Sequence, residues 1–390
     1  MLALFGQSVV RFFRLLWLSL WPPRDSAARR SPARIAIILL FLPLLGLVQL
    51  LHWLGFLCDE IFFRGYRKVE IRAPVFVTGV PRSGTTMLHR LLAADNRFTT
   101  FTTWECLFAP SVTQRRIVQG VRYLDRLVGR PLARLLGWAE KKAFAAMDDI
   151  HDMSLGDAEE DYFVFTPLFS CFILVVPFPY ATWIWDMGRF DVAVEPVEQR
   201  RIIAFYRRAI QRHLYANDPA RQFLSKNATF APFIGALAEE FPDARFVLCL
   251  RDPLRVIPSQ LSSIADGMEL FRNDPAASGF RDAMVTQLHH FYRIVLDPPV
   301  AAGSFSTVVL SQLKDDVQRG VAQLYKALDI PLSDAYSSTL AQLSVQAGGY
   351  QSRHRYELAD YGLDAATVER EFADVYAAWP EMKTGARVAG

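Results

Sequence analysis

One stretch of the chain limits the possible folds more than any other: residues 74–90, which read PVFVTGVPRSGTTMLHR. The apolar run 75–79 is typical of a buried strand, residues 80–85 of a tight loop, and the residues from Thr86 onward of a helix. The first turn of such a helix presents unpaired backbone N–H groups and the positive end of the helix dipole to the preceding loop. We therefore predict a binding site for a phosphate group between this strand and this helix.

The glycine spacing of this loop, from Gly79 to Gly84, is that of a nucleotide P-loop, but Thr85 stands at the position of the P-loop lysine. Kinases and GTPases need that lysine on the β- and γ-phosphates, so its absence argues against hydrolysis of a nucleoside triphosphate. What remains is a set of backbone N–H groups, hydroxyl groups at the helix start, and one cation, Arg82, at the crest of the loop. These groups suit a phosphate monoester, with Arg82 placed to stabilise charge on a departing bridging oxygen. An ordinary strand–turn–helix without a ligand is the alternative interpretation.

A second candidate for anion binding spans residues 251–259, which read RDPLRVIPS. Arg251 follows the apolar run 245–250, which is typical of a strand, and Ser259 falls near the start of the next predicted helix. An arginine and a hydroxyl group beyond the carboxyl end of a strand can converge on one phosphate. Alone this pattern is weak, because Arg-Asp-Pro is common in turns; together with the first loop it predicts two phosphate sites.

With both motifs in place, residues 75–379 resemble the PAPS-dependent sulfotransferase superfamily. The segment 81–86, PRSGTT, is similar to the 5′-phosphosulfate loop of that family, and Arg251 and Ser259 match its 3′-phosphate motif in identity and spacing. The resemblance implies transfer of a sulfuryl group from PAPS to an acceptor hydroxyl and release of PAP, with no metal ion required. Arginine at position 82 resembles the tyrosylprotein and bacterial branches; its implied role is mainly electrostatic, because guanidinium does not readily release a proton.

The resemblance also implies which residues bind the donor. These are Ser83, Gly84, Thr85 and Thr86 around the 5′-phosphate, Arg251 and Ser259 on the 3′-phosphate, Lys226 beside the donor, and Arg355 in a basic lid over the 3′-phosphate. The lysine lies in a segment that resembles the Lys-x-Pro segment of the family. This chain departs from the family pattern there, because Ala228 replaces the proline.

Transfer to a hydroxyl group also calls for a general base within hydrogen-bond reach of that hydroxyl. Glu105, in the segment TTWECLFAP, falls where the tyrosylprotein branch carries its glutamate, and His151 is the rival candidate because imidazole titrates near neutral pH. Each has a structural alternative: Glu105 as a charge at a helix start, and His151 as a partner of a nearby aspartate. The neighbouring Glu159 and Glu160 either orient the acceptor or Arg82, or belong to a solvated face.

Most of the excess hydrophobicity of the chain, which is 52% hydrophobic, lies before residue 64. Residues 1–21 are typical of an interfacial amphipathic helix, with a cleaved signal peptide as the weaker alternative. Residues 35–58 carry no charged side chain and are long enough as a helix to cross a bilayer core of about 30 Å. This run is interpreted as a membrane span, as a bent helix within one leaflet, or as a hairpin buried against the protein. We predict a membrane-associated region over 1–64 and a catalytic domain over 70–390.

The rest of the chain alternates between strand-like and helix-like segments. Strands are predicted at 75–79, 222–225, 245–250 and 304–310, and helices between them and after them, among others at 114–146 and 365–379. This alternation predicts a P-loop-like three-layer α/β/α fold with a mostly parallel central sheet, next to the membrane-associated helices. The 43 basic and 40 acidic residues are spread along the chain, which does not indicate a nucleic-acid partner. The four cysteines lack the spacing of a metal site or a disulfide framework.

Together these patterns predict a membrane-associated, PAPS-dependent sulfotransferase that acts on a lipid-like or otherwise amphiphilic acceptor hydroxyl. A glycan or a small alcohol remains open as the acceptor. A P-loop phosphotransferase and a membrane-anchored, non-catalytic nucleotide-binding adaptor are the alternative functions. The cytosolic supply of PAPS and the few cysteines favour the cytoplasmic side of a bacterial inner membrane, with the Golgi lumen as the alternative compartment.

Overall fold

The computed structural model describes residues 1–382 apart from 136, 139–159, 348–356 and 381. At the centre of this described part is a five-stranded parallel sheet with the strand order β2-β3-β1-β4-β5, which confirms the α/β class. The strands are β1 Val75–Gly79, β2 Phe98–Thr99, β3 Gln222–Lys226, β4 Arg245–Leu250 and β5 Phe305–Val309. The sequence does not predict β2, because two residues are too few to show a strand pattern.

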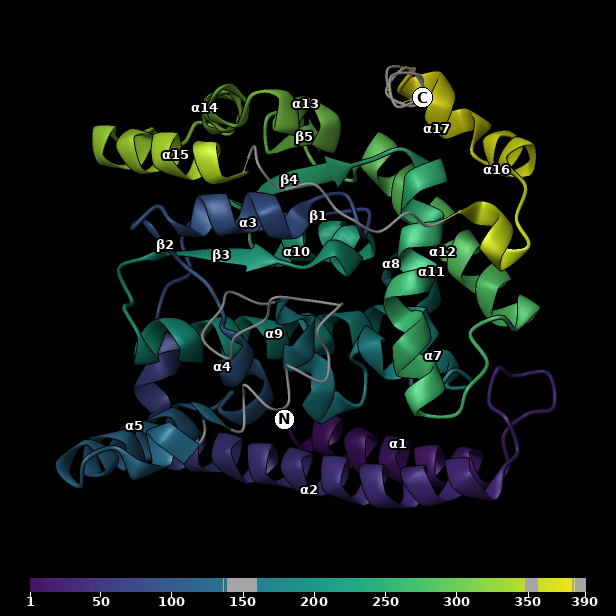
Figure 1. Ribbon diagram of the computed structural model, residues 1–390. Helices are drawn as coiled ribbons and strands as arrows, with labels where there is room; N and C mark the ends of the chain where they lie inside the picture. Colours follow the sequence, from purple (N-terminus) through teal and green to yellow (C-terminus); the bar gives the residue numbers. More distant parts are fainter. Residues whose placement is uncertain (136, 139–159, 348–356, 381, 383–390) are drawn as a thin grey trace.

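Helices surround the sheet and form the outer layers of the molecule (Figure 1). Their bounds are α1 Leu2–Leu20, α2 Pro32–Phe62, α3 Thr85–Ala93, α4 Thr103–Phe108, α5 Val112–Leu127, α7 Thr182–Met187, α8 Phe190–Ala193, α9 Pro196–Ala216, α10 Ile234–Glu240, α11 Pro253–Leu270, α12 Ser278–Leu296, α13 Leu310–Asp315, α14 Val317–Ala327, α15 Asp334–Ala347, α16 Ala365–Glu371 and α17 Ala373–Ala378. Short 3-10 helices are η1 Arg64–Lys68, η2 Asp161–Leu168, η3 Phe172–Val175, η4 Ala228–Phe233 and η5 Leu358–Tyr361.

Both faces of the sheet are covered, because successive residues of a strand point to opposite faces. Val75 and Val77 of β1 pack in one hydrophobic core with residues of α3, α14 and α15. Phe76, between them, packs in the other core with residues of α9, α10 and α12. Figure 1 shows α3 in front of the strands and α10 behind them. The predicted three-layer α/β/α arrangement is thereby confirmed.

Two predicted helices are interrupted in the structure. The helix expected over 114–146 ends as α5, because Gly129 adopts a left-handed backbone conformation with φ of 85°. The carboxylate of Asp125 then accepts a hydrogen bond from the backbone N–H of Leu132 over 2.7 Å, which begins a new helical segment. The segment 365–379 is likewise divided, into α16 and α17. Hydrophobic periodicity continues across both breaks, so the sequence pattern does not reveal them.

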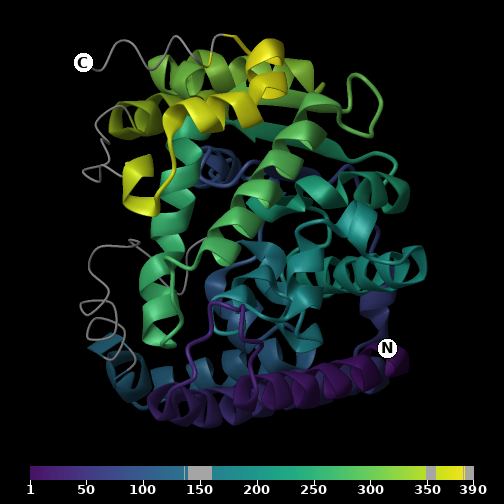
Figure 2. The ribbon, with the colours of Figure 1, turned by 90° about the vertical axis from the view of Figure 1, so that its right-hand side faces the viewer.

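The first two helices form a hairpin along the base of the molecule, and both views show it beside α5 (Figures 1 and 2). The polar side of α1 faces the protein. Arg11 is buried and donates a hydrogen bond to Oγ of Ser170 over 2.7 Å, and the guanidinium of Arg14 lies 4.9 Å from the ring centroid of Trp183. The two arginines of the predicted amphipathic helix therefore fasten α1 to the rest of the chain.

Both ends of α2 are also attached to the rest of the protein. Near its start, buried Arg34 donates a hydrogen bond from Nε to Oδ1 of Asn273 over 3.0 Å. Near its end, buried Asp59 accepts a hydrogen bond of 2.8 Å from Nε of Arg212 on α9. By length and composition α1 and α2 could each cross a membrane, yet α2 is bound at both ends to the same body of protein.

The opposite side of the hairpin is apolar and exposed. The exposed large apolar residues of its two helices and of the residue that follows α1 are Leu2, Phe5, Val9, Val10, Phe13, Trp17, Trp21, Leu39, Leu40, Leu44, Leu47, Leu50, Leu51, Leu54, Leu57, Ile61 and Phe62. On α5 the exposed residues Ile117, Val121, Tyr123, Leu124 and Leu127 extend this surface. We call the exposed apolar residues of α1, α2 and α5 the basal face; exposed apolar residues in such number are typical of an interaction site.

Candidate active site

The loop between β1 and α3 has a backbone that few residues can adopt. Gly79 and Gly84 have φ of 127° and 82°, and a Cβ atom on them would lie 2.3 Å from the carbonyl oxygen of Cys249 and from Cδ1 of Leu310, respectively. Arg82, at the crest, also has a positive φ of 65°. Non-glycine residues seldom adopt this conformation, and those that do occur disproportionately at functional sites. The glycines therefore allow the loop to approach β4 and α13 closely.

Two motifs that lie far apart in the sequence meet at this loop. Nε of Arg82 donates a hydrogen bond to Oγ of Ser259 over 3.0 Å, and Nη1 of Arg251 donates one to the carbonyl oxygen of Arg82 over 3.1 Å. Arg251 directly follows β4, and Ser259 lies on α11. The structure thus brings together the three side chains that the two sequence motifs contribute.

Several buried polar atoms around the loop have no hydrogen-bond partner among the described residues. They are Oγ1 of Thr78, Oγ of Ser83 and Nδ2 of Asn227, whose backbone N–H donates to the carbonyl oxygen of Val77 on β1. A buried donor without a partner is costly, and a bound ligand would supply the missing acceptor. Phosphate oxygens are acceptors only, so these donors fit a bound phosphate group.

Arg82 and Arg251 form no ion pair with a carboxylate among the residues that the structure describes. Burial lowers the pKa of Arg251, and the positive charge of Arg82 lowers it further; burial and then the charge of Arg251 lower the pKa of Lys314 on α13. An anion bound here would relieve this repulsion. The sequence analysis missed Lys314, because a single lysine in a polar helix carries no distinguishing signal.

The part of the chain that contains these residues matches a known family. Residues 74–334, more than half of the chain, match the model of the sulfotransferase family. The chain belongs to the sulfotransferase family. The matched part includes the loop around Arg82 and the segment with Arg251 and Ser259, so the residues that meet in the structure of this sulfotransferase belong to the shared region.

Individual relatives extend the similarity to nearly the whole chain. The omega-hydroxy-beta-dihydromenaquinone-9 sulfotransferases Stf3 of Mycobacterium bovis and Mycobacterium tuberculosis are each 26% identical over 396 residues, covering 90% of this chain and 90% of the relative. The crystal structure of sulfotransferase STF9 from Mycobacterium avium has a TM-score of 0.71 at 17% identity and covers 97% of this chain and 96% of its own. That of STF1 from Mycobacterium tuberculosis H37Rv has a TM-score of 0.65 at 21% identity, with 94% and 93% covered. The shared fold therefore includes α1 and α2.

Lys226, the last residue of β3, lies beside the loop because it pairs in register with Val77 of β1. Its Nζ lies 3.0 Å from Oε1 of Glu160, whose side chain remains 22% exposed. Glu160 belongs to the acidic run that the sequence assigns either to acceptor orientation or to a solvated face. In this sulfotransferase it forms an ion pair with a buried lysine next to the phosphate loop, so it is not simply solvated.

Asp161, next to Glu160, is a second carboxyl group in this area. It is buried and accepts a hydrogen bond from the hydroxyl group of Tyr206, whose oxygen also lies 3.2 Å from Oγ of Ser225. Burial raises the pKa of Asp161 to about 7, although the hydrogen bonds from Tyr206 and Ser225 partly oppose this shift. The carboxyl group therefore takes up a proton near neutral pH.

Glu105 lies in a different environment, at the start of α4. Its carboxylate lies 3.0 Å from Nη1 of Arg115 and 3.2 Å from Nδ1 of His213, and it accepts hydrogen bonds from Asn217 and from the backbone N–H of Thr102. Burial alone would raise the pKa of Glu105, but the charges of His213 and Arg115 outweigh it and hold the pKa below its usual range. These contacts tie α4, α5 and α9 together, which gives Glu105 a structural role whether or not it acts in catalysis.

The remaining predicted site residues fall into two groups. Thr85 is buried in the first turn of α3, and Thr86, next to it, is exposed. His151, the rival base, and Arg355, the predicted lid residue, lie outside the described residues. Their roles stay predictions from the sequence.

Proposed function

We propose that this sulfotransferase transfers a sulfuryl group from PAPS to a hydroxyl group of a lipid-like acceptor at a membrane and releases PAP. The bond between sulfur and the bridging oxygen of the 5′-phosphate breaks, and its electron pair stays on that oxygen. The acceptor oxygen forms a new bond to sulfur, and its proton passes to a base on the protein. Only the donor, the acceptor and protein side chains take part in this step.

The observation that carries the proposal is the contact of Arg82 with Ser259 and Arg251 at the end of β1. These three residues supply two cations and a hydroxyl group to one small region, and neither cation forms an ion pair with a described residue. PAPS carries phosphate groups at its 5′ and 3′ positions, so it needs two adjacent anion sites. We assign the 5′-phosphate to the loop with Ser83 and the start of α3, with Arg82 at the bond that breaks, and the 3′-phosphate to Arg251 and Ser259, with Lys226 nearby.

For the general base we favour Glu160 over Glu105. A base must be reached by the acceptor, and Glu160 is partly exposed beside Lys226, whereas Glu105 is buried among Arg115, His213 and Asn217. The ion pair with Lys226 would orient the carboxylate of Glu160 toward an incoming hydroxyl group. His151 remains a candidate base from the sequence alone.

The proposed acceptor follows from the basal face and from the relatives. The exposed apolar surface of α1, α2 and α5 suits contact with lipid, and the Stf3 relatives are named for a hydroxylated menaquinone, which is a lipid. Because Arg34 and Asp59 bind both ends of α2 to the protein, we propose that the hairpin lies in one leaflet and does not cross the bilayer. The catalytic part would then lie at the cytoplasmic surface, where PAPS is made.

Calorimetric titration with PAP tests the donor assignment. The protein should bind PAP, and Arg251→Ala should weaken binding by about tenfold to a hundredfold, as expected for loss of a charge-assisted hydrogen bond. Arg255→Ala, at an exposed position of α11, is the matched control and should bind PAP normally. Equal binding of PAP by the wild type and by Arg251→Ala would refute the assignment. ATP binding tighter than PAP binding would favour a phosphotransferase, and no binding of either would favour an adaptor.

A further inference from the structure

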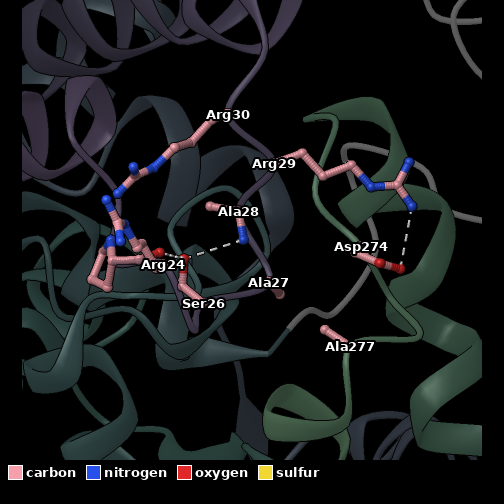
Figure 3. Close-up of a pocket in the computed structure, with 9 residues that line it drawn as sticks. Arg24, Ser26, Ala27, Ala28, Arg29, Arg30, Asp274 and Ala277 are labelled. Carbon is pink, nitrogen blue, oxygen red and sulfur yellow. Dashed lines mark hydrogen bonds and ion pairs between the residues drawn. The ribbon is translucent and has the colours of Figure 1, made fainter.

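The turn that joins α1 to α2 lines an open pocket of about 510 Å³ at one end of the hairpin. It is lined by Pro23, Arg24, Ser26, Ala27, Ala28, Arg29, Arg30, Asp274 and Ala277 (Figure 3). In Figure 1 this turn rises from the end of the hairpin along the side of the molecule. The pocket therefore lies above the edge of the basal face and away from the phosphate loop.

Two of its three arginines are not neutralised. Arg29 points toward Asp274, 3.3 Å away, whereas the guanidinium groups of Arg24 and Arg30 point toward each other on the other side of the turn (Figure 3). Arg30 donates a hydrogen bond to the carbonyl oxygen of Pro22, and neither arginine forms an ion pair with any residue that the structure describes. The nearby Asp25 is exposed and takes no part in an ion pair there. Two adjacent cations without a counterion attract an anion.

The turn is held in place by the catalytic part of the chain. Ala28 forms an antiparallel bridge with Asn273, and the backbone N–H of Asp274 donates to the carbonyl oxygen of Ala27 over 2.8 Å. Ala27 and Ala28 are buried, and Arg34 joins Asn273 from below. The positions of the arginines are therefore set by tertiary contacts and are not those of a free linker.

Apolar residues that suit the surface region of a bilayer flank the turn. Trp17 and Trp21, at the end of α1, are 62% and 59% exposed, and their ring centroids lie 4.5 Å apart. Leu40, near the start of α2, is 76% exposed. Tryptophan is enriched at the level of lipid headgroups, with the hydrocarbon directly beneath. The tryptophans would thus place Arg24 and Arg30 at the depth of the headgroup phosphates.

We propose that the α1–α2 turn binds the phosphate group of an anionic phospholipid, with Arg24 and Arg30 as its cationic contacts. This rests on the membrane association in the proposed function and specifies the lipid class and the site. The basal face supplies apolar contact with any bilayer, and the turn adds a preference for negative headgroups. The anionic lipid would also favour one orientation of the hairpin on the membrane, because Arg24 and Arg30 lie at the end of the hairpin where α1 joins α2.

Sedimentation with lipid vesicles tests the proposal. Wild-type protein should bind vesicles of phosphatidylcholine mixed with phosphatidylglycerol more tightly than vesicles of phosphatidylcholine alone, and added salt should reduce the difference. The variant Arg24→Gln with Arg30→Gln should lose about tenfold or more in binding to the anionic vesicles, as expected for two surface cations. Its binding to phosphatidylcholine alone should be unchanged. The control Arg319→Gln with Lys326→Gln, on exposed positions of α14, removes the same charge and should bind like wild type.

The outcomes distinguish failure of the proposed lipid site from failure of the proposed function. Affinity for PAP should be the same in all three proteins, so loss of PAP binding would concern the donor site and not the lipid site. The proposal is overturned if wild type shows no preference for phosphatidylglycerol, or if the arginine variant keeps that preference. It is also overturned if the variant loses binding to both vesicle types equally, which would assign the arginines to folding of the hairpin. Arginine-dependent binding of inorganic phosphate, without a difference between vesicles, would instead show a site for a free anion.

Discussion

Arg82 and Ser259 are 177 positions apart in the chain, yet Nε of the arginine donates a 3.0 Å hydrogen bond to Oγ of the serine. Arg251 completes the connection through its hydrogen bond to the carbonyl oxygen of Arg82. The two segments proposed to bind the phosphates of PAPS therefore contact each other directly. A ligand with two phosphate groups would find both sites arranged at a fixed separation, which reduces the entropy lost on binding.

Replacement of Ser259 by alanine should affect one phosphate group selectively. We expect Ser259→Ala to weaken PAP binding by about tenfold, since a hydrogen bond to a charged group is lost. Binding of adenosine 5′-phosphate, which lacks the 3′-phosphate, should change much less. Calorimetry with the two nucleotides provides the measurement. An equal loss for both ligands would assign Ser259 to positioning of Arg82 and not to the 3′-phosphate.

Replacement of Arg82 should slow the reaction more than it weakens donor binding. Arg82→Gln keeps a side chain of similar length on a backbone with φ of 65° but removes the charge proposed to stabilise the departing phosphate oxygen. We expect kcat to fall by about a hundredfold to a thousandfold. Arg82→Lys should recover part of the rate. A variant with normal kcat and weakened PAP binding would contradict a role at the bond that breaks.

Replacement of Glu105 should destabilise the fold. Glu105→Gln leaves Arg115 and His213 buried without their carboxylate, and breaking a buried ion pair costs about 3–5 kcal/mol of unfolding free energy. Thermal unfolding should report this loss as a lower Tm. A variant that keeps its Tm but loses activity would instead support Glu105 as the general base.

Replacement of Glu160 should slow the reaction and should lower the stability less than replacement of Glu105 does. If Glu160 is the base, Glu160→Gln should lower kcat by about a hundredfold to ten-thousandfold, with PAP affinity nearly unchanged. The side chain of Glu160 is 22% exposed, whereas that of Glu105 is 4% exposed, so the Tm should fall less than in Glu105→Gln. Steady-state kinetics with Glu105→Gln as the comparison would distinguish the two carboxylates. Full activity of Glu160→Gln would exclude Glu160 as the base and would favour His151.

Asp161 should make stability depend on pH near neutrality. Its pKa is about 7 in the folded protein, whereas an aspartate in an unfolded chain has a pKa of about 3.9. Between these values the folded state holds a proton that the unfolded state has released, so the stability contributed by this group falls as the pH rises from about 4 to about 7 and changes little above that. Asp161→Asn removes the titration. The Tm of the variant relative to wild type should therefore increase from about pH 5 to about pH 8; a constant difference would refute the raised pKa.

The phosphate loop could be predicted because its signal is local. Strand, glycine turn and helix start follow one another within residues 74–90, and backbone geometry links each residue type to its conformation. The strand at 245–250 was equally clear from its apolar run. By contrast, the helix break at Gly129 depends on one backbone angle and on a cap from Asp125, which periodicity does not register.

The choice among carboxylates needed tertiary contacts. Glu105 and Glu160 are both glutamates next to apolar segments, and nothing in the sequence shows that one meets Arg115 and the other Lys226. Lys314 likewise lies within the electrostatic influence of Arg251 because α13 packs beside β5. Such contacts arise from packing between distant segments, so no regular spacing of residues in the sequence predicts them.

The N-terminal region shows the same difference between what the sequence predicts and what tertiary contacts determine. The sequence by itself determined that residues 1–64 are unusually apolar, and that a strand, a glycine turn with Arg82 and a helix follow shortly afterwards. Only the tertiary structure decided which side of the hairpin meets the protein. Arg11 and Arg34 are buried against partners 159 and 239 positions away, because a charge removed from water needs hydrogen-bond partners. The apolar side is left exposed as a consequence, since no other part of the described chain covers it.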